Sequence, residues 1–187
     1  INIIIETENG SYSMMSQNTD EFPESPVISE TKSISMDSEK LRRMIEFTKN
    51  SLSREEMKPA LQGVYIKINQ DQITAVSTDG HRLSKIVYKN TTPNTGQAAK
   101  ELIIPKKFLT VLYTFLEKQE EITLDFSKNH ISASFKGSTL STRLINDTYP
   151  DFEKVIPTNN EKIINTNKTE LLDSVKRVSV LSNRNTR

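Results

Sequence analysis

The sequence contains no cysteine and no tryptophan, and only two histidines and five glycines among its 187 residues. The absence of cysteine excludes disulfides and thiolate metal sites and favours a reducing compartment. We find neither a phosphate-cradling glycine loop nor a nucleophile elbow. No apolar run approaches the roughly 20 residues of a membrane helix, and no leader with a cleavage site begins the chain. We therefore expect a cytosolic protein with no membrane span, no metal and no cofactor.

An excess of charge of either sign is also missing. The 25 lysines and arginines nearly balance the 24 aspartates and glutamates, which leaves a formal net charge of +1. The sequence pI near 8.0 lies below the pI above about 9 that is typical of a dedicated nucleic-acid binder. Any contact with DNA must therefore depend on a local basic surface and be weak.

A partial internal repeat is the first positive feature of the chain. An aromatic–proline pair, a Val–Ile pair, a short strand and a helix follow one another twice, and the copies lie about 130 residues apart. The matching residues are Phe22, Pro23 and Leu41 in the first copy, and Tyr149, Pro150 and Leu171 in the second. The repeat predicts one complete module, preceded by the end of another and followed by the start of a third. We expect the chain to be part of a longer polypeptide.

The pattern of apolar residues predicts the elements of the complete module. After a hairpin over 1–5 and 12–16 and a polar linker over 19–30, Asp37 caps a helix whose apolar residues follow helical spacing. These residues are Leu41, Met44, Ile45, Thr48 and Leu52. Alternation predicts strands over 32–36, 63–68, 72–77, 82–88 and 102–104, with a polar loop over 89–97.

A second helix and a meander complete the module. Pro105 suits the first turn of the helix, which we expect to bury Phe108, Leu112, Phe115 and Leu116. The meander covers 121–126, 130–135 and 138–145. Two helices and about eight strands predict an α+β fold in which helices cover one face of the sheets.

The segment Ser77–Leu83 contains the residues best suited to a functional site. Asp79 and Gly80 favour a tight turn that directs His81 and Arg82 outward. One alternative is a solvated turn in a β-rich interaction module with no role on DNA. Another is a small hydrolase or transferase that uses Asp79, His81 and Arg82, although no third group that would orient the pair is evident.

These features together resemble the β sliding clamp of bacterial DNA polymerase III. Thr78–Leu83 matches the family's Thr-Asp-Gly-His-Arg-Leu signature in full, and Tyr149–Pro157 matches its aromatic-Pro-Asp-aromatic segment. Leu181–Asn183 is similar to a Leu-Ser-Asn motif near the end of the third module's first helix.

The resemblance implies a fold of repeated two-helix, sheet-backed clamp modules. Residues 1–26 would end the first module, 27–157 would form the middle one and 158–187 would begin the third. The family member is a non-catalytic processivity factor whose homodimeric ring encircles duplex DNA regardless of sequence. It tethers the DNA polymerase III α subunit, the clamp loader and repair polymerases, which bind it through short peptide motifs.

The resemblance also implies two sets of site residues. The peptide pocket would comprise Leu61, Thr78, Gly80, His81, Arg82, Leu83, Pro150 and Val155. The basic residues near DNA would be Arg42, Arg43, Arg54, Lys58, Lys106 and Lys107. Pro59 and Ala60 stand where the family often has aromatic residues, which argues against base stacking there.

Overall fold

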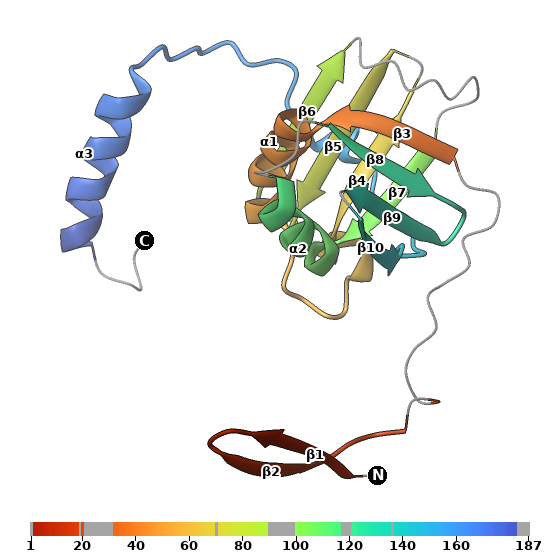
Figure 1. Ribbon diagram of the computed structural model, residues 1–187. Coiled ribbons are helices and arrows are strands. Elements are labelled where there is room, and N and C mark those ends of the chain that lie inside the picture. The colour runs from red at the N-terminus through yellow and green to blue at the C-terminus, as the bar shows by residue number, and fades with distance from the viewer. Residues whose placement is uncertain are drawn as a thin grey trace. The chain divides into compact units, whose positions relative to one another are not determined.

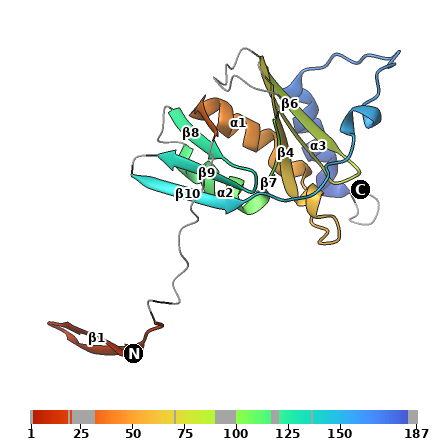
Figure 2. The ribbon, with the colours of Figure 1, turned by 90° about the vertical axis from the view of Figure 1, so that its right-hand side faces the viewer.

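The computed structural model describes residues 2–18, 20, 32–69, 71–89, 100–116, 121–135 and 137–182. The chain divides into two units, 1–149 and 150–187, which are considered separately below. Figures 1 and 2 show the strands and helices of both units. Within the described ranges, no helix is both long and apolar enough to cross a membrane.

The predicted N-terminal hairpin is confirmed. Strand β1 (Asn2–Thr7) pairs antiparallel with β2 (Gly10–Met15). Ile3 lies opposite Met14 and Ile5 opposite Tyr12, so that one face of the hairpin is apolar. Apart from Asp20, the linker predicted over 19–30 lies outside the described residues.

One four-stranded antiparallel sheet carries the signature turn. It contains β4 (Gly63–Ile68), β5 (Gln72–Thr78), β6 (Leu83–Lys89) and β7 (Lys100–Pro105), in the order β6-β5-β4-β7. These strands confirm the predicted alternation. The predicted polar loop lies outside the described residues except for Lys89, which ends β6.

The second four-stranded sheet joins the start of the module to its end. It contains β3 (Lys32–Asp37), β8 (Glu121–Phe126), β9 (His130–Phe135) and β10 (Ser138–Arg143), in the order β10-β9-β8-β3. Ile34 of β3 pairs with Leu124 of β8. The Ser33 hydroxyl also donates a hydrogen bond to the Asp125 carboxylate, which reinforces this non-local pairing.

Helix α1 (Ser38–Thr48) begins where the sequence predicts. The Asp37 side chain accepts a hydrogen bond from the backbone N–H of Lys40 at 2.9 Å and so caps the helix. All five apolar positions expected to face inward are buried, namely Leu41, Met44, Ile45, Thr48 and Leu52.

Helix α2 (Lys106–Leu116) differs from the prediction in two respects. Pro105 ends β7 instead of opening the helix. Phe115 is 45% exposed, whereas Leu109 is buried, so the expected inward position of Phe115 was wrong. The buried stripe runs through Leu109, Leu112 and Leu116, which places Phe115 at its margin, where its ring lies 5.0 Å from that of Phe135.

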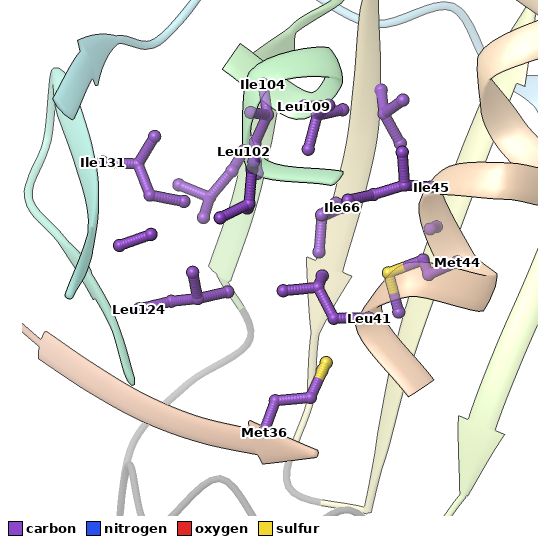
Figure 3. Close-up of a cluster of buried hydrophobic side chains, with 14 of the residues drawn as sticks. Met36, Leu41, Met44, Ile45, Ile66, Leu102, Ile104, Leu109, Leu124 and Ile131 are labelled. Atoms are coloured by element: carbon purple, nitrogen blue, oxygen red, sulfur yellow. The ribbon is translucent and has the colours of Figure 1, made fainter. Parts of the chain in front are cut away.

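Both sheets and both helices contribute to one core (Figure 3), with Leu41 from α1, Ile66 from β4, Leu109 from α2 and Ile131 from β9 among its members. Gly63 allows the backbones of β4 and β7 to lie close together. A Cβ at this position would lie 2.6 Å from Ile103 Cγ2 and 2.8 Å from the carbonyl oxygen of Ile104. Only glycine therefore fits there without a shift of β7.

The second unit consists of a short 3-10 turn, Phe152–Val155, and helix α3 (Lys168–Leu181). Helix α3 begins at the residue that the repeat predicts, and the Asn167 side chain caps it by accepting hydrogen bonds from the N–H groups of Thr169 and Glu170. The short strand expected before this helix was wrong, because residues 157–167 form no strand. No described strand pairs with this segment, and an extended segment without a partner strand forms no ladder.

Candidate functional site

The signature residues form a tight turn between β5 and β6. Gly80 has a φ of 90°, a conformation that L side chains rarely adopt. The Thr78 hydroxyl accepts a hydrogen bond from the Gly80 N–H at 3.1 Å and donates one to the carbonyl oxygen of Arg82 at 2.7 Å. His81 and Arg82 are exposed, as predicted.

Asp79 organises this turn electrostatically. Its Oδ1 accepts hydrogen bonds from the backbone N–H groups of His81 and Arg82, each at 3.0 Å, and its Oδ2 accepts one from Arg82 Nε at 3.0 Å. These backbone hydrogen bonds, with the guanidinium as a smaller contribution, lower the pKa of Asp79 to about 2. The carboxylate is thus ionised and fully engaged, which leaves the hydrolase or transferase alternative without support.

Side-chain hydroxyls attach the strands beside this turn to the end of α1 and to the 3-10 turn Lys49–Ser51 that follows it. Ser77 Oγ donates to the carbonyl oxygen of Thr48 at 2.6 Å, and the hydroxyls of Ser84 and Ser51 lie 2.7 Å apart. Because strand β5 pairs with a neighbour on both sides, the turn projects from a fixed part of the sheet.

Leu61 lies at the same end of the sheet as the signature turn. It belongs to the 3-10 turn Pro59–Gln62, which immediately precedes β4, and β4 begins beside the end of β5 because the two strands are antiparallel. Leu61 is only 8% exposed, whereas Leu83 is half-buried. The structure thus brings the first-unit members of the predicted pocket to one end of one sheet.

Tyr149 also contacts this sheet. Its ring stacks on that of Tyr65 with centroids 4.9 Å apart, and its hydroxyl donates to the carbonyl oxygen of Val76 at 3.5 Å. Burial raises the pKa of Tyr149 to about 12.

The remaining two predicted pocket residues, Pro150 and Val155, belong to the second unit. Both are exposed, and Val155 is 68% exposed. Between them, Asp151 and Lys154 form an ion pair at 2.9 Å across the short helical turn. The side chain of Val155 is therefore available to a ligand.

Three of the six predicted basic residues line one surface groove of about 610 Å³. They are Arg54, Lys106 and Lys107, and the polar residues Ser53, Gln62 and Thr110 share the lining. Both lysines lie in the first turn of α2 and are exposed. The apolar residues Pro105, Val111 and Ile145 complete the lining. The groove thus combines exposed positive charges with hydrogen-bonding and apolar groups, and its cations suit contact with a phosphate backbone.

The other three predicted basic residues have different surroundings. Lys58 forms an ion pair with Glu55 at 2.8 Å, which offsets its charge. The guanidinium of Arg43 lies 5.4 Å from the centre of the Phe47 ring, and that of Arg42 lies 5.1 Å from the centre of the Tyr113 ring. The structure therefore does not bring all six into one cluster.

Two residues that the sequence analysis did not select stand beside Arg42. The ammonium of Lys49 lies 4.6 Å from the centre of the Tyr113 ring, so a single ring contacts two cations. Lys49 follows Arg42 by seven residues, which places both near one stripe of α1 and the turn that follows it. That spacing was the available signal for Lys49, whereas the contact with Tyr113 of α2 had none.

No group of three histidine, aspartate or glutamate side chains in the described ranges could hold a metal ion. His130 begins β9, where its N–H donates to Ser127 Oγ at 3.2 Å as part of the hairpin turn.

Comparisons with known proteins agree with this architecture. The family model described as "DNA polymerase III beta subunit, central domain" matches residues 35–151. The beta sliding clamp of Bacillus subtilis is 28% identical over 180 residues, which cover 96% of this chain and 47% of that protein. The beta sliding clamp of Treponema pallidum is 29% identical over 171 residues, 91% of this chain and 46% of that protein. The chain thus spans less than half the length of these curated relatives.

Solved structures show the same fold. The crystal structure of the DNA polymerase sliding clamp from Bacillus subtilis has a TM-score of 0.87 and 28% identity, and the match covers 98% of this chain and 48% of that one. The DNA polymerase III subunit beta from Pseudomonas aeruginosa has a TM-score of 0.88 at 24% identity, with 98% of this chain and 50% of that one covered.

Proposed function

Since a family model matches more than half of its residues, the chain belongs to the DNA polymerase III beta subunit family, and we propose that it acts as a sliding clamp. This membership confirms the resemblance found in the sequence, and the structural matches confirm the α+β clamp fold. In the proposed role, the complete protein encircles duplex DNA as a homodimeric ring and acts in the cytoplasm. The module boundaries at residues 26 and 157 belong to the same proposal.

The groove lined by Arg54, Lys106 and Lys107 is the observation that supports DNA contact most strongly. A ring that slides must bind phosphates loosely and without sequence preference, because each tight contact would oppose movement. Flexible, exposed lysines at the start of α2 suit such contact. Lys58 would contribute less, since Glu55 already neutralises much of its charge.

We further propose that the sheet end with Leu61, Thr78, Gly80, His81, Arg82 and Leu83 belongs to a peptide-binding site, together with Pro150 and Val155. Half-buried Leu83 and exposed Val155 offer apolar contact, and the rigid turn places His81 and Arg82 as polar groups at the rim. Short peptides of the DNA polymerase III α subunit, the clamp loader and repair polymerases would use this site in turn.

The proposed clamp is not an enzyme. Asp79, the one acid in the signature, is held ionised by the turn itself, and each of its carboxylate oxygens accepts at least one hydrogen bond within the turn. The protein therefore serves to retain other enzymes on DNA.

The experiment that tests the DNA role is the double charge reversal Lys106→Glu with Lys107→Glu in the complete protein. We expect faster loss from circular duplex DNA and a salt dependence weaker by about 0.9 log-log units per lost phosphate contact. The effect should be equal on DNA of any sequence.

A matched control reverses two exposed lysines outside the groove, Lys89→Glu with Lys128→Glu. This pair changes the net charge equally but should leave retention near the wild-type value. Equal behaviour of the two double variants would refute the assignment of the groove to DNA.

A further inference from the structure

Three parts of the proposed peptide site are attached to one short segment of the chain. Residues 48–53, here called the anchor segment, comprise the last residue of α1, the 3-10 turn Lys49–Ser51 and the two residues that follow it. Four of them are buried, namely Thr48, Ser51, Leu52 and Ser53. Because α1 packs against β5 and β6 (Figure 1), the anchor segment begins beside the sheet that carries the signature turn.

Two of the attachments are made by serines that lie opposite each other on β5 and β6. Ser77 and Ser84 are partners in the strand register. The Ser77 hydroxyl donates to the carbonyl oxygen of Thr48 at 2.6 Å, and the Ser84 hydroxyl lies 2.7 Å from that of Ser51. Since a buried hydroxyl is costly without a hydrogen bond, both contacts favour one fixed distance between the sheet and the anchor segment.

These serines are adjacent in sequence to signature residues but face the other way. The next opposite pair in the register is Thr78 and Leu83, which closes the turn. Successive side chains of a strand point to opposite faces, so Leu83 points away from the face on which Ser84 contacts Ser51. Any effect of Ser84 on a ligand at Leu83 is therefore transmitted through the backbone.

The third attachment holds Leu61. The backbone N–H of Ser53 donates to the carbonyl oxygen of Leu61 at 2.9 Å. The Ser53 hydroxyl in turn accepts a hydrogen bond from the backbone N–H of Glu55 at 3.0 Å, which fixes the end of the anchor segment. One buried segment thus reaches Leu61 and the residues next to Thr78 and Leu83.

We propose that the anchor segment positions the peptide site, with Ser51, Ser77 and Ser84 as positioning residues. It holds Leu61 and the signature turn at a fixed distance from each other. This inference rests on the proposed peptide-binding function and adds residues that set its affinity. A site whose walls are already fixed loses less conformational entropy when an extended peptide binds, so weaker attachment should lower the affinity.

The test titrates the complete protein with a labelled peptide that carries Gln followed by Leu and Phe. The variants are Ser51→Ala, Ser84→Ala, their combination and Ser77→Ala, with Leu83→Ala as the positive control for the site. Ser51→Ala and Ser84→Ala should each weaken the affinity about threefold, within the effect of one neutral hydrogen bond. The matched control is Ser132→Ala, because Ser132 of β9 is as buried as Ser51 but belongs to the other sheet.

The coupling between Ser51 and Ser84 tests the contact itself. Because either substitution breaks the same contact, the double variant should bind about as weakly as each single variant. A loss of about ninefold, the product of two independent effects, would overturn the role of this contact. If Ser77→Ala does not fold, the Ser51 and Ser84 variants still decide the inference.

A purely structural role would lower stability without changing the affinity of the folded protein. Ser84→Thr keeps a hydroxyl on a residue type that suits strands, and it should bind within about twofold of wild type. The backbone N–H groups of His81 and Arg82, which donate to Asp79, should exchange hydrogen about threefold faster in Ser51→Ala. In Ser132→Ala they should exchange as in wild type. Wild-type affinity and exchange in a destabilised Ser51→Ala would refute the positioning role.

Failure of this inference differs from failure of the proposed function. If Leu83→Ala weakens peptide binding while Ser51→Ala and Ser84→Ala bind like Ser132→Ala, the positioning role is refuted and the peptide site remains. If Leu83→Ala also binds like Ser132→Ala, the proposed peptide site is refuted, and the positioning role with it.

Discussion

The carboxylate of Asp79 binds both the backbone N–H and the side-chain Nε of Arg82, each at 3.0 Å. One residue thus fixes the turn that presents the signature and also orients the guanidinium on its surface. Asp79 supports the proposed binding surface structurally, and its neighbours are the residues proposed to contact a ligand.

This relationship predicts a pH dependence for Asp79→Asn. The pKa of Asp79 is lowered from 3.8 to about 2 in the folded protein, so its ionised form stabilises the fold. The stabilisation is complete above pH 3.8 and is lost as the pH falls through about 2. Denaturant unfolding should therefore show a less stable variant at pH 7, and the difference should shrink towards zero below pH 4. A difference that is constant over this range would contradict the role of the ionised carboxylate.

For the peptide site, we expect Leu83→Ala and Val155→Ala to weaken binding of a labelled peptide that carries Gln followed by Leu and Phe. Truncation of an apolar anchor commonly costs about 1 to 3 kcal/mol, or roughly 5- to 150-fold in affinity. Val155 is 68% exposed, so its truncation should leave the fold intact. The titration uses the complete protein, with circular dichroism to check folding.

The choice of these two positions over Leu61 follows from burial. Leu61 is 8% exposed, so Leu61→Ala would remove core packing as well as a binding contact. Lys128→Ala provides a control on a distant turn. Wild-type affinity of both Leu83→Ala and Val155→Ala would place the peptide elsewhere.

The close approach at Gly63 predicts a stability effect. Gly63→Ala introduces a Cβ only 2.8 Å from the carbonyl oxygen of Ile104 and even closer to Ile103, so β4 and β7 must separate. Overpacking of this kind costs typically about 1 to 3 kcal/mol. Thermal and denaturant unfolding measure it, and the exposed substitution Thr139→Ala should stay within about 0.5 kcal/mol of wild type. If Gly63→Ala lowers the free energy of unfolding no more than Thr139→Ala does, β7 can shift away from β4 without a large loss of stability.

Tyr149 should ionise late in an alkaline titration. Its pKa is raised to about 12 by burial, whereas an unperturbed tyrosine titrates near 10. The fold therefore loses stability between pH 10 and 12, because the unfolded chain releases this proton first. Ultraviolet absorbance measures tyrosinate formation, and Tyr149→Phe should remove the part of the signal near pH 12. Removal of signal near pH 10 instead would show that the phenol is solvated.

The sequence predicted most elements because their signals are local. Asp37 stands directly before an apolar stripe with helical spacing, and alternation marks β4, β5 and β6. The turn at Asp79 and Gly80 was predictable for the same reason, since its hydrogen bonds join residues within four positions of one another.

The sequence predictions were wrong or incomplete where contacts between separate elements determine the surroundings of a residue. Phe115 fits the helical period but lies at the margin of the buried stripe, against Phe135 of another strand. The groove, and the contacts of Arg42 and Lys49 with the Tyr113 ring, likewise combine residues from separate elements. The charge of a residue in the sequence does not indicate which ring or carboxylate lies beside it. The resemblance therefore supplied candidate cations, but only the structure distinguished Lys58, paired with Glu55, from Lys106 in the groove.

The pairing of β3 with β8 has a consequence for the order of events during synthesis. Strand β3 is made first, but its only partner in the described sheet is β8, whose residues 121–126 follow much later in the chain. Loop closure over such a distance delays folding, because non-local contacts form only after the entropy of the intervening chain is lost. On the ribosome, the backbone groups of β3 that pair with β8 must remain without that partner until β8 has left the exit tunnel. A nascent chain that ends before β8 should therefore remain sensitive to protease at residues 32–37, while one that includes β10 becomes protected there.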